Sequence, residues 1–263
     1  MALENVIYEK KGAVAYVRLN RPKSFNAIDP GFVKDFTKAM EMCSDDDSVR
    51  AVVITGEGKA FCGGGDIAVF KSFFDKDRAE PFREILKVLN PGILALRRMG
   101  KPVIAAVNGA AGGAGMSIAA ACDLRICAAS ARFRAGYPQI GMVGDAGWTL
   151  FVPLLVGFGK AMELMLLDPL FDAKQAYEMG FVNMVVEDEK FASTVSEVAE
   201  KLASGPTKSY AIIKANLNAA MEGLLEQQLE LERMGMFNAA KTEDYVEGVN
   251  AFLEKRKAKF TGK

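Results

Sequence analysis

Short runs of β-prone apolar residues alternate with longer apolar patterns of helical period in the first half of the chain. Residues 14–19, 51–55, 102–107 and 124–128 are strand-like runs bounded by turn residues. Between the first two runs, the pair Asp29–Pro30 is typical of a helix start. Apolar residues follow it at helical spacing, at Phe32, Val33, Phe36, Met40 and Cys43. This alternation predicts an α/β core.

A Gly- and Ala-rich segment separates the runs 102–107 and 124–128. Residues 110–121 hold almost only Ala, Gly and Ser. Small side chains suit a helix that packs closely against a sheet, so we expect one helix over 110–121. The same composition also suits a backbone that approaches a ligand.

The last third of the chain has a helical pattern from about Pro206 onward. One apolar face is formed by Leu224, Leu225, Leu229, Leu231 and Met234. Thr242 is placed to cap a final helix, which carries Val246, Val249, Phe252 and Leu253. Because these faces are large for a peripheral segment, we expect residues 1–200 to form the core and residues 201–263 a helical oligomerisation region.

Composition excludes several classes of protein. Lys plus Arg and Asp plus Glu both number 33 among the 263 residues, so we expect neither a nucleic acid nor a membrane as partner. No run has the ~20 apolar residues of a membrane span, and residues 1–12 lack a signal-peptide core. The four cysteines form no CxxC pair, which predicts reduced thiols in a cytoplasmic protein.

The chain contains no histidine. This excludes a Ser-His-Asp or Cys-His nucleophile and any imidazole metal site. Acid–base chemistry must therefore come from Asp, Glu, Tyr, Lys, Cys or water. We expect no metal.

Three Gly-rich segments could carry chemistry. Residues 61–67 contain three consecutive glycines, residues 108–115 precede a helix, and residues 137–148 place Asp145 among glycines. Such backbones can aim N–H groups at an anion. Each segment also has a plain structural interpretation, as a turn, a close helix–sheet contact or a helix cap. Neither a GxGxxG fingerprint nor a P-loop lysine is present, so dinucleotide and ATP binding are not expected.

These segments occur together with four further motifs, and the combination resembles the crotonase (enoyl-CoA hydratase/isomerase) superfamily from end to end. Residues 21–27 (RPKSFNA) are similar to its RPxxxNA signature, and residues 101–109, 161–164 and 244–256 also match the family pattern.

The resemblance implies a spiral of repeated ββα units with a C-terminal α-helical segment, assembled as a homotrimer or a hexamer. It implies an acyl-CoA thioester as ligand, with coenzyme A as part of the substrate and no further cofactor. The oxyanion hole would be the backbone N–H groups of Gly65 and Ala114. Other substrate-binding residues would be Lys23, Cys62, Gly63, Asp66, Ile67, Gly113 and Tyr137.

The choice of reaction depends on the acidic residues. Hydratases of the family hold water between two glutamates, and those positions correspond here to Ser117 and Tyr137. Asp145 stands where several isomerases carry a lone acid, and the chain is most similar to the type that isomerises ring-epoxide thioesters in phenylacetate breakdown. We expect an isomerase with Asp145 as proton shuttle. A neighbouring apolar wall, such as Trp148 or Phe70, would raise the pKa of its carboxyl, but the sequence does not show whether either lies beside it.

Two alternatives stay open. One is a hydratase that uses another carboxylate, such as Glu80 or Glu84. The other is a non-catalytic subunit that binds CoA thioesters.

Overall fold

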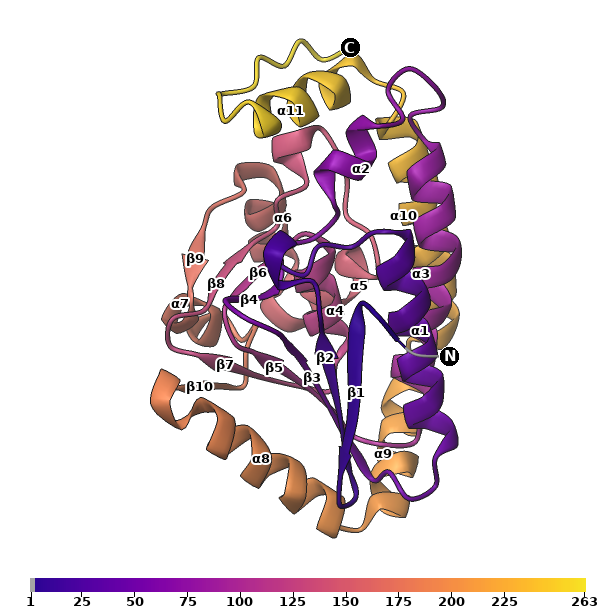
Figure 1. Ribbon diagram of the computed structural model, residues 1–263, viewed down its shortest axis with the longest axis vertical. Helices are drawn as coiled ribbons and strands as arrows, with labels where there is room; N and C mark the ends of the chain where they lie inside the picture. Colours follow the sequence, from indigo (N-terminus) through magenta and orange to yellow (C-terminus); the bar gives the residue numbers. More distant parts are fainter. Residues whose placement is uncertain (1–2) are drawn as a thin grey trace.

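The computed structural model describes residues 3–263, apart from the Glu222 side chain, and contains two β-sheets surrounded by helices (Figure 1). The larger sheet has the order β1-β2-β3-β5-β7-β10, in which the β1–β2 pair is antiparallel and the other pairs are parallel. Its strands are β1 (Val6–Lys11), β2 (Val14–Leu19), β3 (Ala51–Gly56), β5 (Val103–Val107), β7 (Leu124–Ala128) and β10 (Met184–Val186).

The smaller sheet has the order β4-β6-β8-β9, with β8 and β9 antiparallel. Its strands are β4 (Ala60–Cys62), β6 (Ala110–Gly112), β8 (Arg132–Arg134) and β9 (Phe171–Asp172). The helices are α1 (Pro30–Asp45), α2 (Ile67–Lys71), α3 (Glu80–Arg98), α4 (Ala114–Ala121), α5 (Trp148–Val156), α6 (Phe158–Leu167), α7 (Ala173–Glu178), α8 (Asp188–Ser204), α9 (Thr207–Ala219), α10 (Glu222–Ala239) and α11 (Glu243–Leu253), with 3-10 turns η1 (Pro22–Ser24) and η2 (Pro138–Ile140).

The chain repeats one pattern along this path. The pairs β3–β4, β5–β6 and β7–β8 each give their first strand to the larger sheet and their second to the smaller sheet, and helical segments follow. The predicted α/β class with repeated ββα units is confirmed. As a result, the three second strands lie side by side and point in the same direction.

The larger sheet is covered on both faces because its central strands are apolar throughout. Val52 and Ile54 of β3 belong to the main core, whereas Val53 faces Val195 and Ala199 of α8. This alternation is the two-residue period of a pleated strand. Two helix starts are also confirmed: Asp29 accepts a bond from Phe32 N at 2.7 Å, and Thr242 Oγ1 accepts one from Tyr245 N at 3.1 Å.

The prediction of a single helix over residues 110–121 is wrong. Residues 110–112 pair as strand β6 with β4 and β8. Gly113 then adopts φ 51° and ψ −131°, and α4 begins at Ala114. A positive φ of this kind is open to glycine and interrupts the helix. The change places the first amides of α4 at the end of a strand.

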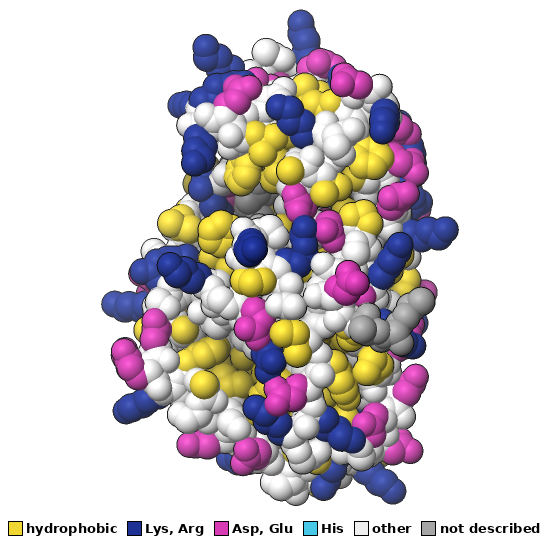
Figure 2. All heavy atoms as spheres, in the orientation of Figure 1, with side chains coloured by type: hydrophobic (Ala, Val, Ile, Leu, Met, Phe, Trp, Pro, Cys, Tyr) yellow, Lys and Arg dark blue, Asp and Glu magenta, His cyan; other side chains and the backbone are white. Residues whose placement is uncertain are grey.

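The C-terminal helices fold back over the repeats. In Figure 1 the helix α11 lies at the top of the molecule above α2, and it packs on η2 and α2. A Cβ at Gly248 would lie 2.6 Å from Ile140 Cα, so the two backbones are in close contact. Figure 2 shows hydrophobic side chains gathered beneath α11 on this face, with Lys and Arg side chains around them. Across the described residues, we find no helix long and apolar enough to cross a bilayer.

Candidate active site

The three Gly-rich segments meet at one edge of the smaller sheet. Residues 63–66 follow β4, residues 113–114 follow β6, and residues 135–137 follow β8. Because these strands are parallel neighbours, their carboxyl ends lie together. Crevices at the carboxyl ends of parallel strands are common ligand sites.

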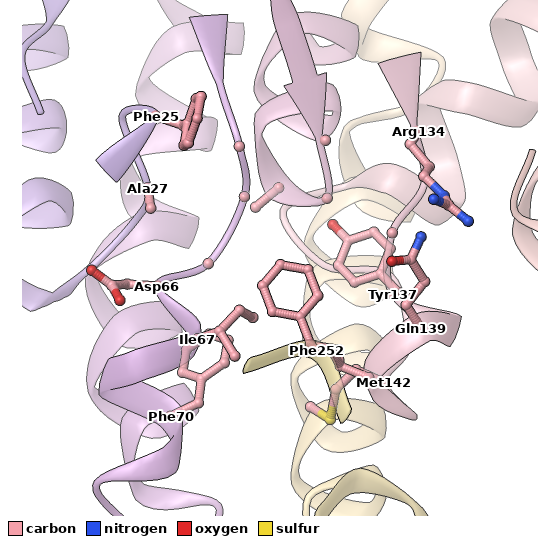
Figure 3. A pocket seen from close by; sticks show the side chains of 18 of the residues that line it. Phe25, Ala27, Asp66, Ile67, Phe70, Arg134, Tyr137, Gln139, Met142 and Phe252 are labelled. Atoms are coloured by element: carbon pink, nitrogen blue, oxygen red, sulfur yellow. The ribbon is translucent and has the colours of Figure 1, made fainter. Parts of the chain in front are cut away.

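A cavity of about 540 Å³ opens at this edge. Figure 3 shows Tyr137, Ile67 and Phe252 pointing into it from three different segments. Its wall is mainly apolar, and includes Phe25, Ala27, Gly63, Gly64, Gly65, Asp66, Ile67, Phe70, Gly113, Ala114, Arg134, Tyr137, Gln139, Ile140, Met142, Asp145, Met236, Phe252 and Leu253. Such a volume and lining are typical of a small-molecule site.

Two backbone amides on this wall have no acceptor within residues 3–263. The N–H of Gly65 and that of Ala114 donate no hydrogen bond to any described residue. Ala114 is the first residue of α4, where the helix dipole favours a negative charge. The loops touch: a Cβ on Gly64 would lie 3.0 Å from Gly112 O. The amides can therefore serve as donors to a ligand oxygen.

Asn26 holds the first of these loops in place. Its fully buried amide nitrogen donates to Ala60 O at 2.8 Å and to Glu57 O at 3.0 Å. Its Oδ1 accepts from Arg21 N at 2.8 Å. The Asn26 side chain thus ties the segment 21–27 to β4, which explains an Asn at this position.

Asp145 ends a chain of hydrogen bonds inside the cavity wall. Tyr137 Oη donates to Asp145 Oδ1 at 2.7 Å, and Ser117 Oγ lies 2.9 Å from the same Tyr137 oxygen. Burial, opposed by the Tyr137 hydrogen bond and assisted by the charge of Glu232, raises the pKa of Asp145 to about 7. Burial also raises the pKa of Tyr137 well above its usual value, so the phenol stays neutral. Asp145 is thus poised to exchange a proton near neutral pH.

Most of the predicted site residues come together. Gly63, Gly65, Asp66, Ile67, Gly113, Ala114, Tyr137 and Asp145 line the cavity. The Asp66 carboxylate is engaged elsewhere, since it caps α2 and lies 3.1 Å from Arg21 Nη2. Figure 3 shows its side chain turned away from the cavity centre.

Two predicted ligand contacts, Lys23 and Cys62, are not on the cavity wall. Lys23 is exposed on η1, and Cys62 is fully buried. Close packing explains the burial, because a Cβ on Gly115 would lie 2.2 Å from Cys62 O. The alternative acids Glu80 and Glu84 are also outside the wall, and Glu80 pairs with Arg83 at 2.6 Å.

Sequence reasoning missed the part of the wall that comes from α10 and α11. Met236, Phe252 and Leu253 line the cavity although they lie about a hundred residues beyond Asp145. In the sequence these three residues fit the apolar face of an ordinary helix, and no neighbouring motif distinguishes them as ligand-binding residues. Among the described residues, no group of three or more Cys, Asp or Glu side chains could hold a metal ion.

Known proteins match the chain over almost its whole length. The family model for enoyl-CoA hydratase/isomerase matches residues 9–263. The chain is 35% identical over 261 residues to 1,2-epoxyphenylacetyl-CoA isomerase of Escherichia coli, covering 99% of this chain and 100% of that protein. It is 36% identical over 266 residues to crotonyl-CoA hydratase of Syntrophomonas wolfei, covering 100% of both.

The crystal structure of an enoyl-CoA hydratase from Mycobacterium avium subsp. paratuberculosis has the same fold. It superposes with a TM-score of 0.90 at 31% identity, over 99% of this chain and 100% of that one. The chain therefore belongs to the enoyl-CoA hydratase/isomerase (crotonase) family. Relatives named as isomerases and as hydratases are about equally similar to it.

Proposed function

We propose that the protein is an acyl-CoA isomerase in which Asp145 moves a proton between two carbons of the acyl group. The observation that carries this proposal is that Asp145 and the two free amides of Gly65 and Ala114 line the same cavity. Among the cavity-lining residues described, the carboxylates are Asp66 and Asp145, and Asp66 is held by Arg21. One acid is sufficient for a proton shuttle.

The proposed reaction on a 3-enoyl thioester has two proton transfers. The ionised Asp145 takes a proton from carbon 2, and the electron pair moves onto the thioester oxygen to give a dienolate. The N–H groups of Gly65 and Ala114 stabilise that oxygen, and each such donor is commonly worth roughly 10²–10³ in rate. Protonated Asp145 then returns the proton to carbon 4, which leaves the double bond between carbons 2 and 3.

The same arrangement argues against hydration. Ser117 and Tyr137 stand at the two positions where the family's hydratases carry glutamates, and they are hydrogen-bonded to each other at 2.9 Å. A neutral phenol with a strongly raised pKa is a poor base for water. Hydratase names among the relatives keep hydration as the second candidate.

Incubation with a 3-enoyl-CoA in heavy water separates the candidates by product mass. An isomerase gives the 2-enoyl thioester with no added water and with a deuterium where the shuttled proton has exchanged. A product heavier by one water would identify a hydratase. Tight binding with no reaction on aliphatic and aromatic substrates would identify a non-catalytic subunit.

We further propose a ring-epoxide aryl thioester as one substrate to test, because the isomerase relative is named for such a compound. We also propose a homotrimer or a hexamer. Many large apolar side chains are exposed on α5, α6 and α9, which supports contacts between copies; they include Leu154, Phe158, Leu166, Leu167, Ile212, Ile213 and Leu217. Sedimentation would measure the oligomer. Cytoplasmic location stays a prediction.

A further inference from the structure

A buried carboxylate outside the cavity wall contacts the segment that follows Asp145. Glu232 of α10 is 4% exposed. Its Oε2 accepts a hydrogen bond from Gly147 N at 2.8 Å, and its Oε1 accepts one from Thr149 N at 2.8 Å and another from Thr149 Oγ1 at 2.5 Å. Burial raises the pKa of Glu232, and these three hydrogen bonds oppose that rise because they stabilise the ionised carboxylate.

These donors belong to the segment that follows Asp145. Ala146 has φ 52° and Gly147 has φ 85°, so the chain makes a left-handed turn before α5 begins at Trp148. A non-glycine residue in this region is strained and persists only where other contacts hold it. Glu232 supplies such contacts, from 85 residues further along the chain.

Glu232 also provides the side-chain cap of α5, whose N-cap residue is Gly147. Its carboxylate accepts from the N–H of Gly147 and from that of Thr149 in the first turn. The Asp145 carboxylate bonds to Tyr137 on the cavity wall.

We infer that Glu232 is a positioning residue for the reaction: its buried negative charge caps α5, fixes the strained turn and holds the Asp145 carboxyl toward the cavity. This inference rests on the proposed function. The titratable groups facing Asp145 are Tyr137 from the segment after β8, Cys62 from β4, and Glu232 from α10. In the described part of the chain, no Lys or Arg is paired with Glu232.

Two variants separate the effect of the Glu232 charge from the effect of its side-chain length. Glu232→Gln removes the charge, so the pKa of Asp145 falls and the pH midpoint of kcat moves to lower pH. Glu232→Asp keeps the charge but is one methylene too short to reach both amides. We expect the kcat of Glu232→Asp to fall roughly 10–10²-fold, because a small displacement of the Asp145 carboxyl lowers the rate of proton transfer. The pH midpoint of kcat for this variant should stay near that of the wild type.

The matched controls are Glu230→Gln and Glu230→Asp, on the same helix at an exposed surface pair with Arg233. We expect both to behave as the wild type with a 3-enoyl-CoA. The inference is overturned if Glu232→Asp keeps wild-type kcat, or if Glu232→Gln folds and keeps the wild-type midpoint. If Glu232→Gln does not fold, Glu232→Asp alone decides. If wild type itself does not isomerise the substrate, or Asp145→Asn does so fully, the proposed function fails instead.

Discussion

The burial of Asp145 lowers the free energy of unfolding by an amount that can be measured. Burial raises the pKa of Asp145 from 3.8 to about 7 in the folded protein. Below pH 3.8 the carboxyl is protonated in both the folded and the unfolded state, so it has no effect. As the pH rises toward 7, the unfolded chain ionises while the folded protein keeps the proton. Stability therefore decreases with rising pH across this window and levels off above it.

The size of the effect follows from the two pKa values. Each pH unit within the window costs about 1.4 kcal/mol, so the acid destabilises the fold by roughly 2 kcal/mol at pH 5 and roughly 4 kcal/mol at pH 8. Asp145→Asn removes the ionisation but keeps the shape of the side chain. We expect the variant to gain about 2–3 kcal/mol relative to wild type between pH 5 and pH 8.

Urea unfolding at a fixed protein concentration measures this difference. Wild type and Asp145→Asn are compared at pH 5 and at pH 8, so that every other titrating group cancels. Asp75→Asn is the control, because Asp75 is exposed. If the difference in unfolding free energy between wild type and Asp145→Asn is the same at both pH values, the Asp145 carboxyl titrates normally in the folded state and its pKa is not raised.

Two further predictions concern the reaction itself. The kcat of the wild type should rise with pH and level off above about pH 7, because ionised Asp145 is the base. Tyr137→Phe removes a hydrogen bond that lowers the pKa of Asp145, so the pH profile of kcat for this variant should move to higher pH. An unchanged pH profile would count against the contact between Tyr137 and Asp145. Gly65→Ala should lower kcat roughly 10²-fold. Its Cβ would lie 2.3 Å from Cζ of Phe70, and because that ring is buried against Phe82 we expect the loop that carries the amide to move. Gly159→Ala is the control, because the new Cβ would lie in open space. If Gly65→Ala and Gly159→Ala have the same kcat, the proposed role of the Gly65 amide is contradicted.

Local patterns were sufficient to predict the strands β2, β3, β5 and β7 of the larger sheet, two helix caps and the α/β class, but not the strands of the smaller sheet. The strand β3 is apolar on both faces, and Asp29 precedes a clear helical period, so neither depends on distant contacts. The segment 110–121 shows the limit. Ala and Gly are compatible with both strand and helix, and only the pairing of β6 with β4 and β8 decides between them.

The site could be predicted only where its residues lie in distinctive loops. Gly65, Ala114 and Asp145 follow strands and carry glycine neighbours that make them visible in the sequence. Glu232 and Phe252 do not, because each sits on a regular helix and becomes important only when that helix folds over the loops. Tertiary packing therefore supplies the part of the site that sequence patterns do not contain.

We propose that Asp145 carries the proton between the two carbons. The most direct test is the rate at which wild type and Asp145→Asn convert a 3-enoyl-CoA into the 2-enoyl-CoA at pH 8, measured by chromatography of the products. We expect Asp145→Asn still to bind the thioester but to lose roughly 10²–10⁴ in kcat. Full turnover by Asp145→Asn would mean that another group carries the proton.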